Sequence, residues 1–356
     1  MRTRVTIADV ARRAQVSKVT VSYVLNGRGG EARISPETAS RVLAAARELN
    51  YSPNAVARML VTKRTDVLAV VFQRGHFFST WSSFIAEVMR GVSSAAVESG
   101  YDLMLHTKDV SPESEAFVLS DGRVDGALVL RDEGDPILDG LLAAQLPFVQ
   151  FFTRTDRPDC AYVDADNYAG GRLATRHLID LGHRKIAMVR GSLRSTSSND
   201  RFNGYRDALE TAGIGVAPER VVSIPTPASD FEVFTRLLES PDKPTAVFVW
   251  SDEIAFRCME AARDLGLSIP DDLSVVGFDS LEACNRSAPP LTSVRQPVFE
   301  MAREATISLV AMIRDPDAPR PQMVFPLTLD VRSSTAPPRG GNAPSGPRKR
   351  GFSGNC

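Results

Sequence analysis

The chain has 356 residues, of which 43% are hydrophobic and 24% are charged, and its formal net charge is −1. The length predicts two or three domains, and the composition is that of an ordinary globular chain. No apolar run approaches the roughly 18 residues of a membrane-spanning helix, and the N-terminus MRTRVTIADV has no apolar segment typical of a secretory signal.

The charges are distributed unevenly along the chain. Residues 1–65 hold 12 Lys and Arg against 4 Asp and Glu, whereas the remainder holds 30 against 39. A small basic head on a larger acidic body predicts that the head contacts nucleic acid. The like charge of the body keeps it away from the same polymer.

The four cysteines are Cys160, Cys258, Cys284 and Cys356. They form no C-x-x-C pair and their spacing matches no zinc site, so we expect reduced thiols, no metal and no cofactor. Together with the N-terminus, this pattern predicts a cytoplasmic protein.

The head is predicted to consist of three helices. Thr6 and Asp9 form a capping-box-like pair at the start of the first, and residues 14–16 make a tight turn. Ser17 caps the second helix, which ends at Asn26-Gly27. The third begins at Ser35-Pro36-Glu37 and places Val42, Leu43, Ala46 and Leu49 at helical spacing. Two short helices joined by a turn and followed by a third are typical of a helix-turn-helix that binds DNA.

From Val67 onward, short apolar runs alternate with helical stretches. Continuous apolar strands of this kind predict parallel sheets that helices cover on both faces. About eight such units exceed one usual domain, so we expect two α/β lobes with a ligand cleft between them. Gly100, Gly182 and Gly266 stand where helices should end. The predicted strands are residues 67–72, 101–106, 126–130, 147–152, 185–189, 220–224, 245–250 and 273–278, and the predicted helices include 84–99, 166–181 and 252–265.

Residues 335–356 are rich in Pro, Gly and Arg and offer nothing to bury, so we predict a disordered basic tail. The tail either adds weak affinity for DNA or is simply solvated.

Four motifs occur in order along the chain: VTIADVARRAQVSKVTVSYVLNG, SPETASRVLAAARELNYSPNAVARML, LGHRKIAMVRG and LSVVGFD. Over residues 4–332 the chain resembles the lactose/galactose repressor family of bacterial transcription factors. The resemblance implies an all-α helix-turn-helix head and an α/β core of two doubly wound parallel-sheet lobes, similar to periplasmic sugar-binding proteins. It also implies a homodimer bound to a palindromic operator.

The resemblance also implies domain boundaries. The DNA-binding head is residues 1–52, a hinge helix and linker follow at 53–65, and the ligand-binding and dimerisation core spans 66–334. Within the core, we expect lobe 1 at about 66–162 and 293–328, and lobe 2 at about 163–292.

In the family, the N-terminal part of the second helix reads the major groove. The base-reading positions match Lys18, Val19 and Tyr23, which suit a guanine acceptor, a thymine methyl and another acceptor. Many relatives carry Arg at the position of Tyr23, which leaves open whether Tyr23 contacts a base, contacts a phosphate or packs. The residues suited to phosphate contacts are Thr6, Ser17, Thr20, Ser22 and Asn26.

The hinge of the family matches Asn54, Ala57 and Leu60. Paired hinge helices enter the minor groove there, and a Leu wedges between base steps. Leu60 either takes that role or packs within a linker. Because residues 53–61 are too few to hold a helix in water, we expect the hinge to fold only on operator DNA.

Ligand positions of the family fall in the core. Arg201 matches an Arg that clamps sugar hydroxyls or an effector carboxylate, and Asp279 matches an acceptor at a strand end. Phe231 matches an aromatic that stacks on the ligand. Ser251 occupies a position often held by Asn.

The segment 73–84 should line the mouth of the cleft. Phe78, Trp81 and Phe84 are candidates either for stacking on a sugar or for ordinary packing. Arg154 and Asp164 are weaker candidates, and the four His residues show no metal-like spacing.

These observations predict a transcription regulator, most simply a repressor, whose operator affinity is controlled by a sugar bound between the lobes. A purine or another metabolite acting as corepressor is the alternative, and induction and corepression both remain open. A plain sugar-binding protein would need a signal peptide and no basic head. No G-x-S-x-G, P-loop or early G-x-G-x-x-G occurs, so we expect no catalytic residues and no enzyme.

Overall fold

The computed structural model describes residues 5–25, 32–52, 59, 62, 64–73, 83–224 and 230–339. The chain divides into two compact units, Met1–Thr65 and Asp66–Cys356.

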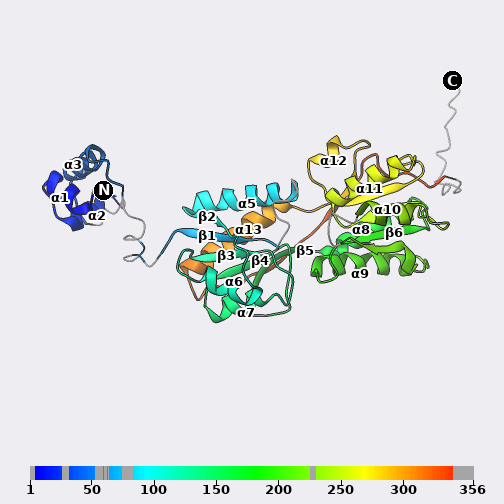
Figure 1. The fold of residues 1–356 in the computed structure, drawn as a ribbon, viewed down its shortest axis with the longest axis horizontal. Helices are drawn as coiled ribbons and strands as arrows, with labels where there is room; N and C mark the ends of the chain where they lie inside the picture. Colours follow the sequence, from blue (N-terminus) through cyan, green and yellow to red (C-terminus); the bar gives the residue numbers. More distant parts are fainter. Residues whose placement is uncertain are drawn as a thin grey trace, which may run out of the picture. The chain divides into compact units, whose positions relative to one another are not determined.

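The head unit is a bundle of three helices, α1 (Ile7–Ala14), α2 (Lys18–Leu25) and α3 (Pro36–Glu48) (Figure 1). Small and β-branched side chains let the helices approach closely. Its core is formed by Val10, Ala11, Ala14, Val21, Val42, Ala45 and Ala46. Leu43, predicted as an inner residue, is 41% exposed because the inner face of α3 follows Val42 and its neighbours at positions 45 and 46.

The predicted helix starts are confirmed. The backbone N–H and the hydroxyl of Thr6 both donate to Asp9 Oδ2, at 3.0 and 2.7 Å. The Ser17 hydroxyl accepts from the Thr20 backbone N–H at 3.0 Å, and the Ser35 hydroxyl accepts from that of Thr38 at 3.2 Å. These bonds satisfy N–H groups that a helix leaves without intrahelical partners.

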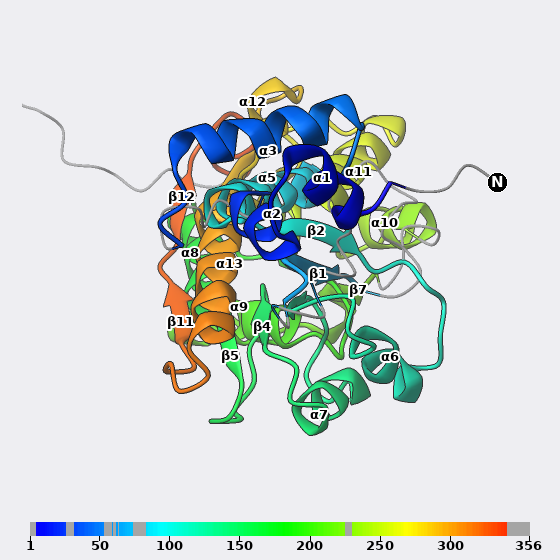
Figure 2. The ribbon, with the colours of Figure 1, turned by 90° about the vertical axis from the view of Figure 1, so that its left-hand side faces the viewer.

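The core unit contains two six-stranded sheets. The first has the order β11-β5-β4-β3-β1-β2, and its paired strands are all parallel. Helices α5 (Ser83–Ser99) and α13 (Val298–Arg314) pack on one face, and α6 (Pro112–Leu119) and α7 (Pro136–Ala143) on the other (Figures 1 and 2). The strands are β1 (Val67–Val71), β2 (Asp102–Leu105), β3 (Gly126–Val129), β4 (Phe148–Phe151), β5 (Ala161–Ala165) and β11 (Gln322–Phe325).

The second sheet has the order β12-β10-β9-β8-β6-β7. Helices α8 (Asn167–Asp180) and α9 (Thr196–Thr211) cover one face, and α10 (Asp230–Leu238) and α11 (Asp252–Asp264) the other. A 3-10 turn at Pro218–Arg220 and the short α12 (Ala283–Arg286) complete the lobe. The strands are β6 (Ile186–Arg190), β7 (Val221–Ser223), β8 (Ala246–Val249), β9 (Ser274–Asp279), β10 (Thr292–Arg295) and β12 (Thr328–Asp330).

The chain crosses between the sheets three times, and the strand pairings give the lobe to which the residues beside each crossing belong. The first follows β5, so residues 163–165 belong to the first lobe. The second follows β10, which pairs with β9, so residues 293–295 belong to the second lobe. The third precedes β12. Because the chain leaves this sheet at the end of β10 and re-enters at the same end, β12 runs antiparallel to β10, whereas we expected parallel strands throughout.

The prediction of a disordered tail is wrong at its start. The Thr335 hydroxyl contacts His177 Nε2 at 3.0 Å, and the Ala336 backbone N–H donates to Ser274 Oγ at 3.0 Å. Arg339 pairs with Asp271 at 3.1 Å. Backbone, hydroxyl and guanidinium groups thus bind this segment to the second lobe. Residues 340–356 lie outside the described part.

Further observations concern membrane spans, the cysteines and the glycines at helix ends. No described helix is long and apolar enough to cross a membrane. Cys160, Cys258 and Cys284 are buried free thiols, and the described part contains no cluster of His, Cys, Asp and Glu suited to a metal ion. The predicted glycines at helix ends, Gly100, Gly182 and Gly266, have positive φ.

Candidate DNA interface and effector site

The N-terminal half of α2 presents an exposed face. Val21 is fully buried and fixes the rotation of the helix, whereas Val19 is 62% exposed. Ser17 and Lys18 are exposed as well. An apolar side chain left in solvent between polar ones on a reading helix suits contact with a thymine methyl. Thr20, Ser22 and Tyr23 are half-buried beside this face.

Several predicted site residues lie outside the described part of the chain. These are Asn26, the hinge residues Asn54, Ala57 and Leu60, and the loop aromatics Phe78 and Trp81. The backbone of Phe231 begins α10, but its side chain is not described. The roles predicted for these residues stay predictions.

In the core, Arg201 of α9 occupies the centre of a polar cluster and is only 6% exposed. Its Nε donates to Asn167 Oδ1 at 2.9 Å, and Nη1 donates to the Trp250 carbonyl. Its guanidinium carbon lies 3.4 Å from the centre of the Phe278 ring. These contacts from α8 and from the ends of β8 and β9 hold the guanidinium plane in one orientation.

Two glycines bring α8 and α9 together and thereby place Arg201. A Cβ atom on Gly171 would lie 2.2 Å from the Arg201 carbonyl oxygen, and one on Gly204 would lie 2.1 Å from that of Tyr168. Only glycine permits so close an approach of the two backbones.

Three buried carboxylates surround Arg201. Asp164, Asp252 and Asp279 are 1%, 1% and 6% exposed. Burial raises the pKa of Asp164 and of Asp252 to about 6. Burial and the charge of Asp252 raise the pKa of Asp279 well above its ordinary value, against the opposing effect of Arg201. A fixed donor fork beside several acceptors suits a ligand that carries neighbouring hydroxyl groups.

The turn after β9 is strained. Asp279 has φ 113° and Ser280 has φ 53°, which are costly for residues with a Cβ, about 1–3 kcal/mol each. Two backbone bonds hold the turn: Ser280 N–H donates to Ser293 Oγ at 3.1 Å, and Leu281 N–H donates to Asp252 Oδ2 at 3.1 Å. Strain of this kind is typical of a ligand site.

Direct contacts join the two lobes beside this cluster. Arg154, which follows β4, pairs with Asp200 of α9 at 2.8 Å. The Ser197 hydroxyl donates to the Phe152 carbonyl at 3.1 Å. The buried hydroxyls of Thr153 and Ser198, the Trp250 indole N–H and the Gln150 amide have no hydrogen-bond partner within the described part of the chain. Unsatisfied buried groups at a lobe boundary are consistent with a site for a polar ligand.

Of the predicted ligand residues, the structure brings Arg201, Asp279 and Asp164 together. Ser251 caps α11, with its hydroxyl accepting from the Ile254 N–H at 3.4 Å. Phe84 makes an edge contact with Phe152, at 4.9 Å between ring centres, and packs on the first-lobe core.

Sequence reasoning missed Asn167, Trp250 and Phe278. Each stands within two residues of a strand end in the sequence. Their position at the carboxyl ends of parallel strands is the signal by which these three residues could have been found.

Comparisons with known proteins identify both units. Residues 6–54 match the model for bacterial regulatory proteins of the lacI family, and residues 175–335 match a periplasmic binding protein-like domain. The ribose operon repressor of Haemophilus influenzae is 34% identical over 92% of this chain and 98% of its own length. The transcriptional repressor PurR of H. influenzae strain PittEE is 33% identical over 88% of this chain and 92% of its own length.

Two solved structures extend the likeness to three dimensions. A complex of the transcriptional regulator CelR with cellobiose has a TM-score of 0.71 and 33% identity, covering 93% of this chain and all of the other (100%). The lac repressor dimer bound to operator and an anti-inducer has a TM-score of 0.81 and 27% identity, covering 94% of this chain and 100% of the other.

A helix-turn-helix head followed by a two-lobed, periplasmic-binding-protein-like core defines a DNA-binding regulator with a ligand-binding domain. The chain belongs to the lacI family of bacterial regulatory proteins. The family consists of transcription regulators and not enzymes, in agreement with the sequence, and its partners are operator DNA and a small-molecule effector.

Proposed function

We propose that the chain is a homodimeric repressor of the bacterial cytoplasm whose affinity for a palindromic operator is set by a sugar bound between the two core lobes. The observation that supports a sugar as the effector is the placement of Arg201 among Asp164, Asp252 and Asp279. Two relatives support it, since one is named for ribose and another was solved with cellobiose.

Control of DNA binding follows from two lobe arrangements. The ligand favours one arrangement because it binds that arrangement more tightly, and the hinge at residues 53–65 transmits the difference to the head. Coupling of this type changes affinity by about 5–150-fold. Repressors named PurR are also relatives, so a purine or another metabolite acting as corepressor is the second candidate.

The ligand class is tested by thermal shift of the full chain with ribose, cellobiose and glucose against adenine and hypoxanthine. Stabilisation by a sugar and by no nucleobase supports the first candidate. Stabilisation by a nucleobase alone overturns it in favour of the second.

For the head, we propose that Lys18, Val19 and Tyr23 contact bases and that Thr6, Ser17, Thr20, Ser22 and Asn26 contact phosphates. Lys18→Ala should relax specificity at one base pair of an operator obtained by selection from random duplexes, at a cost of about 1–3 kcal/mol. Equal weakening on every sequence would make Lys18 a phosphate contact instead.

For the hinge, we propose that Asn54 and Ala57 enter the minor groove and that Leu60 wedges into the central base step. Leu60→Gly should weaken operator binding and leave ligand binding intact, because the wedge supports the bent DNA. Unchanged DNA affinity would remove Leu60 from this role.

A further inference from the structure

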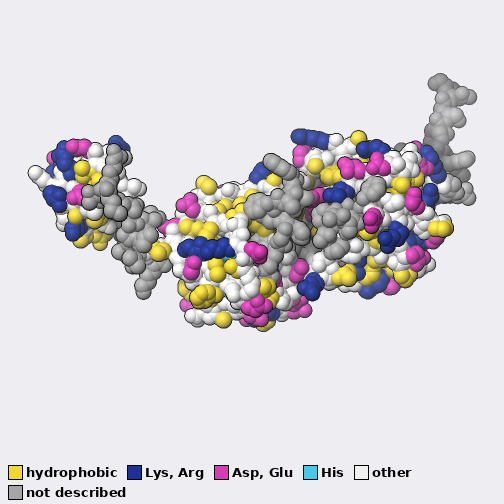
Figure 3. Space-filling view, viewed as in Figure 1, with side chains coloured by type: hydrophobic (Ala, Val, Ile, Leu, Met, Phe, Trp, Pro, Cys, Tyr) yellow, Lys and Arg dark blue, Asp and Glu magenta, His cyan; other side chains and the backbone are white. Residues whose placement is uncertain are grey.

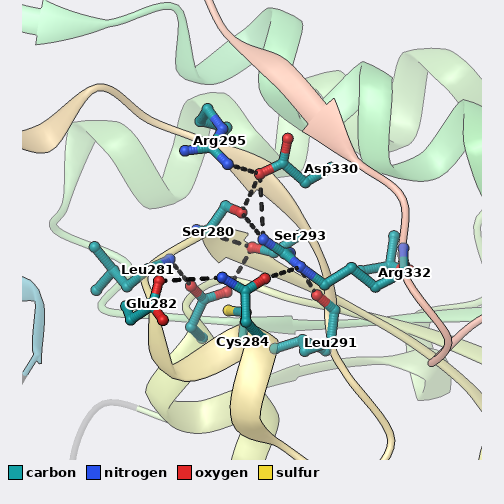
Figure 4. Close-up of polar contacts among 12 residues, drawn as sticks. Ser280, Leu281, Glu282, Cys284, Leu291, Ser293, Arg295, Asp330 and Arg332 are labelled. Carbon is teal, nitrogen blue, oxygen red and sulfur yellow. Dashed lines mark hydrogen bonds and ion pairs between the residues drawn. The ribbon is translucent and has the colours of Figure 1, made fainter.

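Asp330 of β12 joins several segments of the second lobe. Its Oδ2 accepts from the Ser280 hydroxyl at 2.6 Å and forms ion pairs with Arg295 and, at 3.3 Å, with Arg332 (Figure 4). Partial burial raises the pKa of Asp330, but the Ser280 hydrogen bond and the two arginines lower it overall. The carboxylate is therefore charged at neutral pH.

A chain of hydrogen bonds continues from Ser280 to the effector site. Ser280 N–H donates to Ser293 Oγ at 3.1 Å, and Ser293 Oγ donates to Asp252 Oδ1 at 2.5 Å. Figure 4 shows this chain running from Asp330 through the two serines. Asp330 is thus linked to Asp252 through the hydroxyl and backbone N–H of Ser280 and the hydroxyl of Ser293.

Arg332 holds the same turn from the other side. Its guanidinium donates to the Leu291 carbonyl at 2.7 Å, to Asn285 Oδ1 at 2.8 Å and to Ser280 Oγ at 3.0 Å. The start of β10 and the short helix α12 are thereby bound to the strained turn after β9.

The network lies at two of the three crossings between the lobes. Arg295 directly precedes the second crossing, where the Gln296 N–H donates to the Asp279 carbonyl at 3.2 Å. Asp330 follows the third crossing, and it stands opposite Ser293 in the β10–β12 pair. Any change in the angle between the lobes must pass through these segments.

We propose that Asp330 is a positioning residue that makes the Asp279 turn and two crossing strands move as one unit, so that effector occupancy changes the arrangement of the lobes. The signalling part rests on the proposed function, because it requires an effector at Asp279. The mechanical link is a property of the ligand-free protein.

Amide hydrogen exchange of the ligand-free full chain tests the link. In Asp330→Ala we expect exchange at Ser280, Leu281 and Gln296 to rise by at least about fivefold, with β6 and β8 unchanged. Asp242→Ala is the matched control, since Asp242 also pairs with two cations, Lys185 and Arg220, in the same lobe.

Unchanged exchange at these three amides in Asp330→Ala would overturn the proposal. The same holds if β6 and β8 exchange faster to the same degree, or if Asp242→Ala reproduces the effect, because the loss would then be general destabilisation.

The signalling part is tested with ribose and cellobiose as probes. With each chain saturated by its probe, we expect the ratio of operator Kd with and without probe to fall to within about threefold of one in Asp330→Ala. A ratio equal to that of the unaltered chain overturns the signalling role. If neither sugar binds the unaltered chain, the sugar assignment fails, and hydrogen exchange alone decides the proposal.

Discussion

The Arg201 guanidinium lies over the Phe278 ring, with its central carbon 3.4 Å from the ring centre, while its Nε donates to Asn167. The stack and the hydrogen bond fix the plane in which the remaining N–H groups point. Because Phe278 directly precedes Asp279 in β9, the same strand sets the donor and an acceptor of the site.

Replacing Arg201 by Lys tests whether sugar binding needs the planar guanidinium group or only a positive charge. Arg201→Lys keeps the charge among the buried carboxylates but loses the stack and the fork. We expect the Kd of a sugar that stabilises the unaltered chain to rise by at least about tenfold in isothermal titration, with the core still folded. Arg90→Lys is the control, since Arg90 stacks on Phe299 in the first lobe. An unchanged Kd in Arg201→Lys would remove the guanidinium from the site.

Gly171→Ala tests the packing that places Arg201. The new Cβ would stand 2.2 Å from the Arg201 carbonyl oxygen, so α8 and α9 must separate. We expect the free energy of unfolding of the core to fall by about 1–3 kcal/mol. Urea unfolding monitored by tryptophan fluorescence measures this change. Gly215→Ala is the control, because its Cβ meets nothing within 4 Å. Equal stability of both variants would contradict the close contact.

Asp164 makes the stability of the core depend on pH in a defined direction. Its folded-state pKa of about 6 exceeds the unfolded value, so the folded state binds the additional proton. The contribution of Asp164 to stability is therefore present at low pH and is lost as the pH rises from about 4 through 6.

We expect Asp164→Asn to be less destabilised, relative to the unaltered chain, at pH 7.5 than at pH 5. Urea unfolding at the two pH values measures the difference in stability. Because both proteins have the same histidines, the contribution of the histidines to the pH dependence cancels in this comparison. A difference that does not change with pH would mean that the carboxyl titrates normally.

Two Ser-Pro-Glu sequences provide a matched test of helix capping in the head. Ser35 caps α3 through the Thr38 N–H, whereas Ser111 precedes α6 without a side-chain capping bond. We expect Ser35→Ala to cost about 1 kcal/mol, seen as about fivefold faster amide exchange in α3. Ser111→Ala should leave exchange in α6 nearly unchanged. Equal effects in both helices would count against the cap.

Much of the fold was predictable because its signals are local. The caps at Thr6, Ser17 and Ser35 and the long apolar strands need only neighbouring residues to be recognised. The strands β5, β10, β11 and β12 were missed because polar residues such as Asp164, Ser293 and Asp330 interrupt their apolar runs. Their pairing depends on distant segments, which a periodicity in the sequence does not reveal.

The site was predictable to a smaller extent. Arg201 and Asp279 were found through the family resemblance, and Asp164 was named only as a weaker candidate. The role of Asn167 in orienting Arg201, and of Ser280 and Asp330 in holding the Asp279 turn, arises from contacts between segments 34 to 50 residues apart. No pattern of residue types at fixed spacing encodes such contacts.

The central claim is that a ligand in the core controls the head, and one measurement tests it most directly. Fluorescence anisotropy gives the Kd of the full chain for its selected operator, with and without a saturating sugar that stabilises the protein. We predict a change of about 5–150-fold in the unaltered chain and a smaller change in Arg201→Lys at the same sugar concentration. An operator Kd that stays the same while the sugar is bound would contradict the account.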